Sequence, residues 1–302
     1  MGLSLGTLFP LSWRLWLGKL LFRPFDGPCT RVSWHRVIKG PCRPSEVEAM
    51  QYIALHTNIP IPKVYAVHTW EDRIYIEMAY IKGDNLDDAW RTKGALTPEQ
   101  KKVIFADINQ YVCILRGLKP PSEDLVASAF QNPAYDCRIG FRFFGPMNHR
   151  EFQSLTRQHL RFEDIGLLGK EVEQINTTRY RTYFTHGDLI PRNIIIRNGR
   201  VAALIDWGFS GWYPEYWEFT KAHYDYFPSE EWYEYLRQAL PCYDVELAAE
   251  RTLWTRLPEP GTHTVGYYDG QYYENTGSKP SPAWVDARAG RQLTDLWSLV
   301  EF

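Results

Sequence analysis

The sequence lacks the cysteine patterns of zinc sites and disulfide frameworks. Its five cysteines are odd in number and widely scattered, and no Cys-x-x-Cys pair occurs. Such pairs are the usual signal for a zinc site, and an even set of cysteines is usual for a disulfide-bonded fold. A reducing compartment is the simpler inference, and we expect a cytoplasmic protein.

No block of basic residues is present either. The 34 Lys and Arg residues and the 36 Asp and Glu residues give a formal net charge of −2. Nucleic-acid-binding proteins usually carry a basic patch, so the charge does not favour a nucleic-acid partner. Hydrophobic residues make up 44% of the 302 residues, which is enough for a substantial core and for one large domain or two lobes.

The chain also lacks a continuous apolar segment long enough to cross a membrane. Residues 3–22 are rich in Leu, Trp and Phe, but Pro10, Arg14 and Lys19 interrupt them. A spanning helix needs about 20 mostly uncharged residues, and a signal peptide has its charge first and its small residues last. We therefore expect no stable membrane insertion. Residues 1–22 are predicted to hold a leading helix over Leu11–Leu21 that covers the first lobe, with membrane attachment as the alternative.

Motifs of the common hydrolases are absent. There is no His-Glu-x-x-His and no Gly-x-Ser-x-Gly. These motifs supply the zinc ligands of many metalloproteases and the nucleophile of α/β-hydrolases. The chemistry must therefore be sought elsewhere in the chain.

The first part of the chain has mainly strand patterns. Polar and apolar residues alternate over residues 30–38, which is typical of a half-buried strand. Residues 45–56 have the apolar spacing of a helix, with Ser45 as its cap. Residues 64–68 and 73–78 are predicted to be two further strands.

Beyond Gly83 the pattern is mostly helical. Residues 121–148 have the Gly, Pro and aromatic content of an ordered loop. Helices are predicted over residues 86–90, 98–118, 150–159, 164–178, 217–226, 230–240, 245–257 and 287–300. The predicted fold is α+β with two lobes: a small strand-rich lobe over residues 1–80 and a larger helical lobe over residues 81–302. A cleft between unequal lobes is a common ligand site.

One polar hairpin interrupts the helical lobe. Residues 194–196 and 201–205 are short, β-branched runs joined through Asn198-Gly199, which is a strong hairpin signal. The hairpin brings Asn193, before its first strand, close to Asp206, after its second. Asp188 precedes Asn193 by five residues, so three oxygen-bearing side chains converge, as a hard cation and a phosphate require.

These residues resemble a known family. His186-Gly-Asp188 followed by Asn193 and Asp206 is similar to the catalytic loop and metal-binding Asp of the protein-kinase-like fold. Gly at the middle position, Trp207 after the Asp, and the tail over residues 211–218 resemble the aminoglycoside phosphotransferase and choline kinase branch, in a fungal-type version. The resemblance covers roughly residues 30–260.

The resemblance implies roles for the hairpin residues. Asp188 would orient the acceptor hydroxyl or accept its proton, and His186 would support the loop. Asn193 and Asp206 would hold Mg²⁺ against the phosphates of ATP. The alternative for each residue alone is an N-cap or an Asx turn.

The resemblance also implies nucleotide-binding residues in the first lobe. Lys39 looks like the lysine that contacts the α- and β-phosphates, and Glu48 like its ion-pair partner in the next helix. Glu46 competes with Glu48 for this role. Met78 and Ile81 would belong to the hinge segment whose backbone pairs with adenine.

An acceptor pocket is expected after Asp206. Its aromatic and acidic side chains would suit a cationic small molecule with a hydroxyl group. The alternative is that they pack the loop onto the second lobe. The candidates are Trp212, Tyr213, Glu215, Trp217 and Glu218.

One departure from kinases leaves two functions open. No Gly-x-Gly-x-x-Gly precedes the lysine, and only Gly27 is available nearby. The first hypothesis is an ATP- and Mg²⁺-dependent phosphotransferase that acts on a small-molecule hydroxyl. The second is a catalytically impaired kinase-fold protein that binds a ligand or serves as a scaffold. A protein kinase is less favoured, because little chain separates Asp206 from Trp217 for an activation loop.

Overall fold

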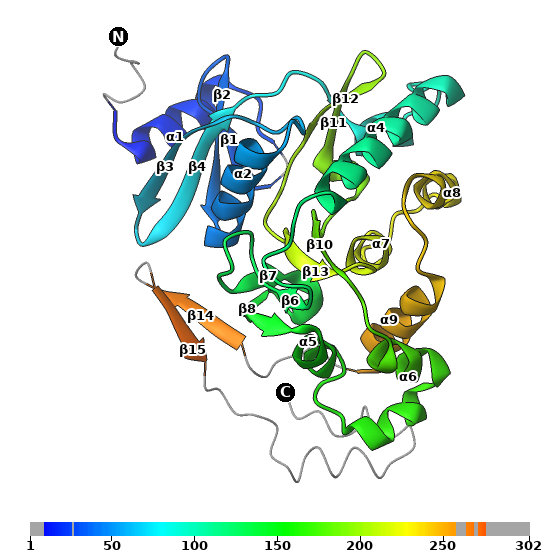
Figure 1. Cartoon of the computed structure of the whole chain (residues 1–302). Coiled ribbons are helices and arrows are strands. Elements are labelled where there is room, and N and C mark those ends of the chain that lie inside the picture. Colours follow the sequence, from blue (N-terminus) through cyan, green and yellow to red (C-terminus); the bar gives the residue numbers. More distant parts are fainter. Residues whose placement is uncertain (1–8, 26, 258–263, 269–270, 276–302) are drawn as a thin grey trace.

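The computed structural model describes residues 9–25, 27–257, 264–268 and 271–275 (Figure 1). A sheet-rich lobe formed by the first part of the chain packs on a larger, mostly helical lobe. The helix predicted over residues 287–300 lies outside the described residues.

The first lobe contains a four-stranded antiparallel sheet in the order β1-β2-β4-β3. Its strands are β1 (Cys29–Arg31), β2 (Arg36–Cys42), β3 (Val64–Trp70) and β4 (Arg73–Ala79). The prediction of one strand over residues 30–38 is wrong. The N–H groups of Val32 and Ser33 both donate to the carbonyl of Arg36, so the chain reverses direction there. Lys39, which follows the predicted strand, consequently lies inside β2, opposite Ile76.

Two helices cover opposite faces of this sheet. Helix α2 (Pro44–His56) buries Met50 and Ile53 in the same core as Ile76. Helix α1 (Leu11–Leu21) has the predicted bounds. It contacts Glu77, which follows Ile76 in β4 and therefore points to the other face of the sheet, because successive side chains of a strand alternate.

Helix α1 is attached to the sheet by specific contacts. The guanidinium of Arg14 donates two hydrogen bonds to the carboxylate of Glu77, at 2.9 and 2.7 Å. Gly18 lies so close to β1 that a Cβ atom there would be 2.4 Å from the carbonyl oxygen of Arg31. Arg36 and His68 also contact Glu77, at 2.8 and 3.0 Å, so this buried carboxylate joins α1 to two strands.

The second lobe begins with β5 (Asp84–Asn85), α3 (Leu86–Arg91) and the long helix α4 (Pro98–Arg116). Helix α4 begins where predicted, because Thr97 and Gln100 form a capping box and Pro98 occupies the first turn. The helices that follow are α5 (His149–Thr156), α6 (Lys170–Thr177), α7 (Trp217–Lys221), α8 (Glu230–Ala239) and α9 (Asp244–Arg256).

Short strands connect and support these helices. The region predicted to be a loop contains β6 (Leu125–Val126), β7 (Ala134–Asp136), β8 (Arg142–Phe144) and β9 (Met147–Asn148). Strands β10 (Thr182–Thr185) and β13 (Gly211–Pro214) pair with each other, and β11 (Ile194–Arg197) pairs with β12 (Arg200–Leu204) and β5. Strand β14 (Thr264–Tyr268) pairs with β8 and with β15 (Gln271–Asn275).

The larger hydrophobic core runs through both lobes. It extends from Met50 in α2 through Phe184 and Trp207 to Trp232 in α8. The ring of Tyr52 stacks on that of Phe184 across the lobes, with centroids 5.3 Å apart. Throughout the residues whose placement is described, no helix is both long and apolar enough to cross a membrane.

Candidate active site

Asp188 lies on the loop between β10 and β11 and is held from two sides. Its backbone N–H donates to Nδ1 of His186 at 3.2 Å. The side-chain amide of Asn193 donates to Oδ2 of Asp188 at 2.7 Å and to its carbonyl oxygen at 2.9 Å. The predicted meeting of Asp188 and Asn193 is therefore observed.

Burial changes the acidity of Asp188. The residue is only 6% exposed, and burial raises the pKa of its carboxyl to about 6. The cations of Lys221 and Arg192 act in the opposite direction and keep the shift moderate. A carboxylate with such a pKa is suited to accept a proton near neutral pH.

The hairpin places Asp206 beside Asn193. Asn198 and Gly199 both have positive φ, 55° and 72°, as a tight hairpin turn requires. After β12, the N–H of Ile205 donates to the carbonyl of Asn193 at 2.9 Å, so the two strand ends stay together. Asp206 itself has φ of 62° and a side chain that is 47% exposed.

Lys39 connects the two lobes at this point. Its Nζ donates to Oε1 of Glu46 at 2.5 Å and to Oδ1 of Asp206 at 2.8 Å. Burial opposes the ionisation of Asp206, but the ammonium of Lys39 outweighs it and holds the pKa of that carboxyl below its usual range. Asp206 is therefore an anion at neutral pH.

The prediction that Glu48 pairs with Lys39 is wrong. Glu48 instead accepts hydrogen bonds from Ser128 Oγ at 2.5 Å and from Asn132 Nδ2 at 3.0 Å. Two residues along a helix are about 200° apart, so Glu46 and Glu48 point to opposite sides of α2. Only Glu46 faces the sheet that carries Lys39.

Asn193 and Asp206 fit a magnesium site completed by a nucleotide. Over the described part of the chain, no three His, Cys, Asp or Glu residues form a group that could hold a metal ion. Both amide hydrogen bonds of Asn193 go to Asp188, which leaves its amide oxygen pointing away from that residue. One amide oxygen and one half-exposed carboxylate suit Mg²⁺, which usually takes few protein ligands and keeps water and phosphate oxygens.

The sequence matches the family described as "Phosphotransferase enzyme family" over residues 42–251. The chain belongs to this family. It is a phosphotransferase with the protein-kinase-like fold of that family. No curated protein matches the sequence closely enough to be counted as a relative.

Solved structures of similar fold include a thermostable mutant of aminoglycoside phosphotransferase APH(4)-Ia, in ternary complex with AMP-PNP and hygromycin B. It has 13% sequence identity and a TM-score of 0.50, covering 81% of this chain and 88% of that chain. The macrolide 2'-phosphotransferase MphH from Brachybacterium faecium has 14% identity and a TM-score of 0.43, covering 73% and 75%.

The identity of the Lys39 partner in this phosphotransferase is tested by a matched pair of variants. We expect Glu46→Gln to lower kcat/KM by about 10–100-fold, because the ammonium loses the carboxylate that positions it. Glu48→Gln removes one charge from the same helix and should change kcat/KM by less than about threefold. Steady-state kinetics with varied nucleotide measures both. A larger loss in Glu48→Gln would contradict the observed pairing.

A buried carboxylate supports the loop that carries Asp188. Glu218 accepts the N–H groups of His186 at 2.6 Å and of Gly187 at 3.1 Å. Burial raises the pKa of Glu218 to about 7, and these two donors act against the rise. Glu218 is therefore a structural partner of the loop. Its place in an acceptor pocket stays a prediction.

His186 has the supporting position that the sequence suggested. Its Nδ1 accepts the N–H of Asp188, so its Nε2 carries the proton and donates to the carbonyl of Ile205 at 3.1 Å. Burial lowers the pKa of His186 to about 4, and the ring is neutral at physiological pH. The imidazole thereby joins the loop of Asp188 to the strand end before Asp206.

Glycine is required between His186 and Asp188. Gly187 has φ of 76°, and a Cβ atom there would lie 2.5 Å from the carbonyl oxygen of Phe209. We expect Gly187→Ala to lower the free energy of unfolding by about 2–5 kcal/mol, through backbone strain and the clash together. Thermal or urea unfolding measures this.

Gly94 provides the matched control. Its φ is 78°, and no atom lies within 4 Å of a Cβ built there. Gly94→Ala should therefore cost only the backbone strain, about 1–2 kcal/mol. Equal losses in the two variants would show that the close approach of Phe209 is unimportant.

The aromatic candidates for the acceptor pocket lie in the core. Trp212, Tyr213 and Trp217 are 0% exposed, so the prediction that they contact an acceptor is wrong. The physical reason for Trp212 and Tyr213 is that β13 pairs with β10, which places one ring in each of the two hydrophobic clusters. Trp217 begins α7 and packs in the second cluster. Glu215 is bound by the N–H of Arg181 and the hydroxyl of Tyr243, each at 3.0 Å, and also has a structural contact set.

Two cations near Asp188 were not predicted from the sequence. Arg192 lies 3.7 Å from Oδ2 of Asp188 and forms an ion pair with Asp225 at 2.7 Å. Lys221 is buried and donates to Asp136 at 2.8 Å. Arg192 could have been found, because it directly precedes Asn193. Lys221 could not, since its partner is 85 residues away.

Backbone N–H groups of the hinge segment already donate hydrogen bonds within the first lobe. Met78 belongs to β4 and is 6% exposed, and Ile81 follows that strand. The N–H of Ala79 donates to the carbonyl of Lys63, and that of Tyr80 to the carbonyl of His35. A role of Met78 and Ile81 beside adenine stays a prediction.

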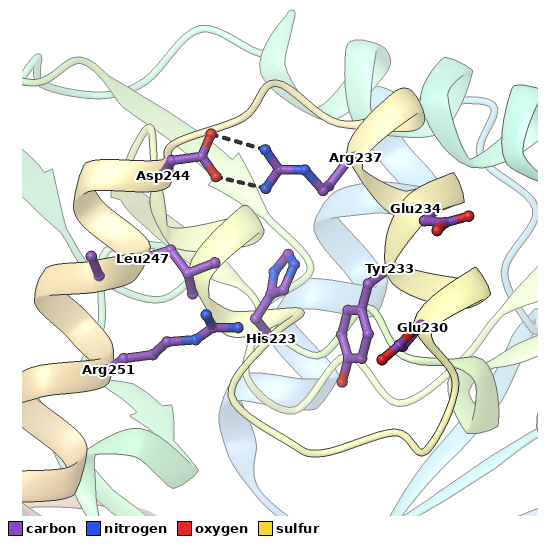
Figure 2. Close-up of a pocket in the computed structure, with 9 residues that line it drawn as sticks. His223, Glu230, Tyr233, Glu234, Arg237, Asp244, Leu247 and Arg251 are labelled. Atoms are coloured by element: carbon purple, nitrogen blue, oxygen red, sulfur yellow. Dashed lines mark hydrogen bonds and ion pairs between the residues drawn. The ribbon is translucent and has the colours of Figure 1, made fainter.

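A surface pocket of about 320 Å³ lies elsewhere, at α8 and α9 (Figure 2). Arg237 and Asp244 close one side with hydrogen bonds of 2.6 and 3.0 Å, and His223 and Tyr233 form another part of the wall. None of its lining residues belongs to the group around Asp188 and Lys39. The pocket is therefore separate from the candidate active site.

Proposed function

We propose that this phosphotransferase transfers the γ-phosphoryl group of ATP, as its Mg²⁺ complex, to a hydroxyl group of a small molecule. The observation that carries this proposal is the convergence of Lys39 and Asp206 across the lobes, next to Asp188 and Asn193. A cation that binds phosphate, two hard oxygen donors for a metal ion and a buried carboxylate are the components that phosphoryl transfer uses.

Each residue has a defined task in the proposed reaction. Lys39, positioned by Glu46, binds phosphate oxygens of the nucleotide. Asn193 and Asp206 hold Mg²⁺, which supplies charge neutralisation on the phosphates. Asp188 orients the acceptor hydroxyl and takes its proton as the bond to phosphorus forms. Arg192, close to Asp188, is placed to stabilise negative charge on the transferred group.

A small acceptor is favoured over a protein. Only ten residues separate Asp206 from Trp217, where α7 begins, and several of them are buried in β13. A protein kinase needs a longer segment here to hold a peptide substrate. The short segment instead leaves a site between the half-exposed Asp206 and the buried Asp188, which suits a small acceptor.

The raised pKa of Asp188 predicts the pH dependence of turnover. The base works as a carboxylate, so kcat should fall about tenfold per pH unit below an inflection near the pKa of about 6, and level off above it. A pH profile at saturating substrate measures this. The residual activity of Asp188→Asn should show no such inflection. An inflection that persists in this variant would assign the titration to another group.

A second function is supported by the turn between β1 and β2. Residues 32–35 contain no glycine, and Arg31 closes the turn by donating to the carbonyls of Ser33 and Trp34 at 3.2 Å. Such a turn is less adaptable than a glycine-rich loop over phosphates. The glycine-free turn therefore favours a second function, in which the protein is catalytically impaired and binds a ligand or serves as a scaffold.

A thermal-shift titration separates the two functions. With Mg²⁺ present, ATP at 100 times its dissociation constant adds about 2.7 kcal/mol to the stability of the folded state and raises Tm by several degrees. EDTA should reduce the shift if Asn193 and Asp206 hold the metal. An unchanged Tm at millimolar ATP with Mg²⁺ would favour the catalytically impaired protein.

A further inference from the structure

The outward face of α1 carries an apolar stripe. Trp13, Trp16 and Leu20 are 59%, 61% and 68% exposed, and their spacing of three and four residues puts them on one side of the helix. Phe9 precedes Trp13 by four residues and is 52% exposed. Large apolar side chains that are exposed together usually mark an interaction surface.

The opposite face of the helix is already engaged. Arg14 binds Glu77, and Gly18 packs on the backbone of β1. The stripe is therefore not the face by which α1 packs on its own lobe. Over the described part of the chain, no ring or hydrogen-bond contact involves the side chains of Trp13 and Trp16.

The charged side chains of the segment that carries the stripe are all positive. Residues 1–25 include Arg14, Lys19 and Arg23 but no Asp or Glu. Glu77 neutralises Arg14, while Lys19 and Arg23 are exposed. The surface that α1 presents is thus apolar, rich in tryptophan and cationic.

We propose that α1 binds an anionic lipid surface and lies in the plane of the interface. Tryptophan, leucine and phenylalanine on one side with flanking basic residues are the composition of interfacial helices. Tryptophan rings prefer the headgroup level, and Lys19 and Arg23 complement anionic headgroups. At 11 residues, α1 is about 16 Å long and too short to span the bilayer.

The charge pattern argues for lipid over a second copy of the chain. A two-fold contact would set this surface against itself, so that Lys19 and Arg23 would meet only other cations. Binding to lipid also leaves the Arg14–Glu77 contact intact, because that contact is on the other side of the helix. The proposal does not depend on the reaction, since it concerns only the outward face of α1.

Sedimentation of the full chain with vesicles tests the proposal. Phosphatidylcholine vesicles that contain phosphatidylserine should pellet the protein, and pure phosphatidylcholine vesicles should bind it more weakly. The triple variant Trp13→Gln, Trp16→Gln, Leu20→Gln should bind the anionic vesicles at least about tenfold more weakly. Lys19→Gln and Arg23→Gln should each weaken binding about fivefold, and high salt should act in the same direction.

A matched control replaces three exposed apolar residues elsewhere. Leu55, Phe162 and Leu167 are 74%, 53% and 47% exposed, and their change to Gln should leave vesicle binding unaltered. Equal Tm values for both triple variants would show that folding is preserved. The proposal is overturned if the wild-type chain ignores anionic vesicles, if both triple variants bind equally, or if sedimentation velocity without lipid shows a dimer that only the α1 substitutions dissociate.

Discussion

Asp188→Asn is expected to lower kcat by about 10²–10⁴-fold, because the amide cannot accept the proton of the acceptor hydroxyl. The substitution keeps the size of the side chain. Asn193 can still donate to the carbonyl oxygen of residue 188, at 2.9 Å in the parent protein. Nucleotide affinity and Tm should therefore stay close to those of the parent, and the loss should appear in kcat.

The control for this variant is Asp88→Asn. Asp88 is exposed on α3, and its replacement removes the same charge without touching the site. It should leave kcat within about twofold of the parent value. If Asp188→Asn turned over acceptor as fast as Asp88→Asn, Asp188 would have no role as the base.

Asp206→Asn is expected to lower kcat/KM by about 10³-fold, because the loss of an anionic metal ligand removes several kcal/mol of charge stabilisation. The same change removes the carboxylate that Lys39 contacts at 2.8 Å. The stabilisation by ATP in a thermal-shift assay should consequently become smaller, and EDTA should have little further effect on the variant.

Asp72→Asn is a matched control for Asp206→Asn. Asp72 is an exposed turn residue with φ of 58°, close to the 62° of Asp206. Asparagine tolerates this left-handed conformation, so neither change should strain the backbone. Full Mg²⁺-dependent nucleotide binding by Asp206→Asn would show that the metal is held elsewhere.

The parts of the fold that local sequence determines were predicted well. Asn198-Gly199 fixes the turn of the β11–β12 hairpin, and the hairpin brings Asn193 to Asp206. Thr97 and Pro98 fix the start of α4 in the same local way. The family assignment followed from the hairpin motifs, and the match over residues 42–251 agrees with it.

The turn between β1 and β2 is a local feature that the alternating pattern concealed. The errors about the site concern properties that depend on distant residues. Whether Glu46 or Glu48 meets Lys39 depends on the rotation of α2 against the sheet, which a spacing in sequence does not give. The burial of Trp212 and Tyr213 depends on the pairing of β13 with β10, and that of Trp217 on the packing of α7 in the second cluster. An aromatic and acidic segment can either line a pocket or fill a core, and only the packing of the other elements decides between them.

The central claim is that this site transfers phosphate from ATP to a small alcohol. Its most direct test is to incubate the wild-type chain with ATP, Mg²⁺ and a panel of sugars, amines and amino alcohols, and to follow ADP release and the phosphorylated product by ³¹P NMR. We expect ADP release that requires one class of acceptor, yields its phosphate ester, stops with EDTA and is lost in Asp188→Asn. Nucleotide binding with no phosphate ester from any acceptor, or ester formation that persists in Asp188→Asn, would contradict the account.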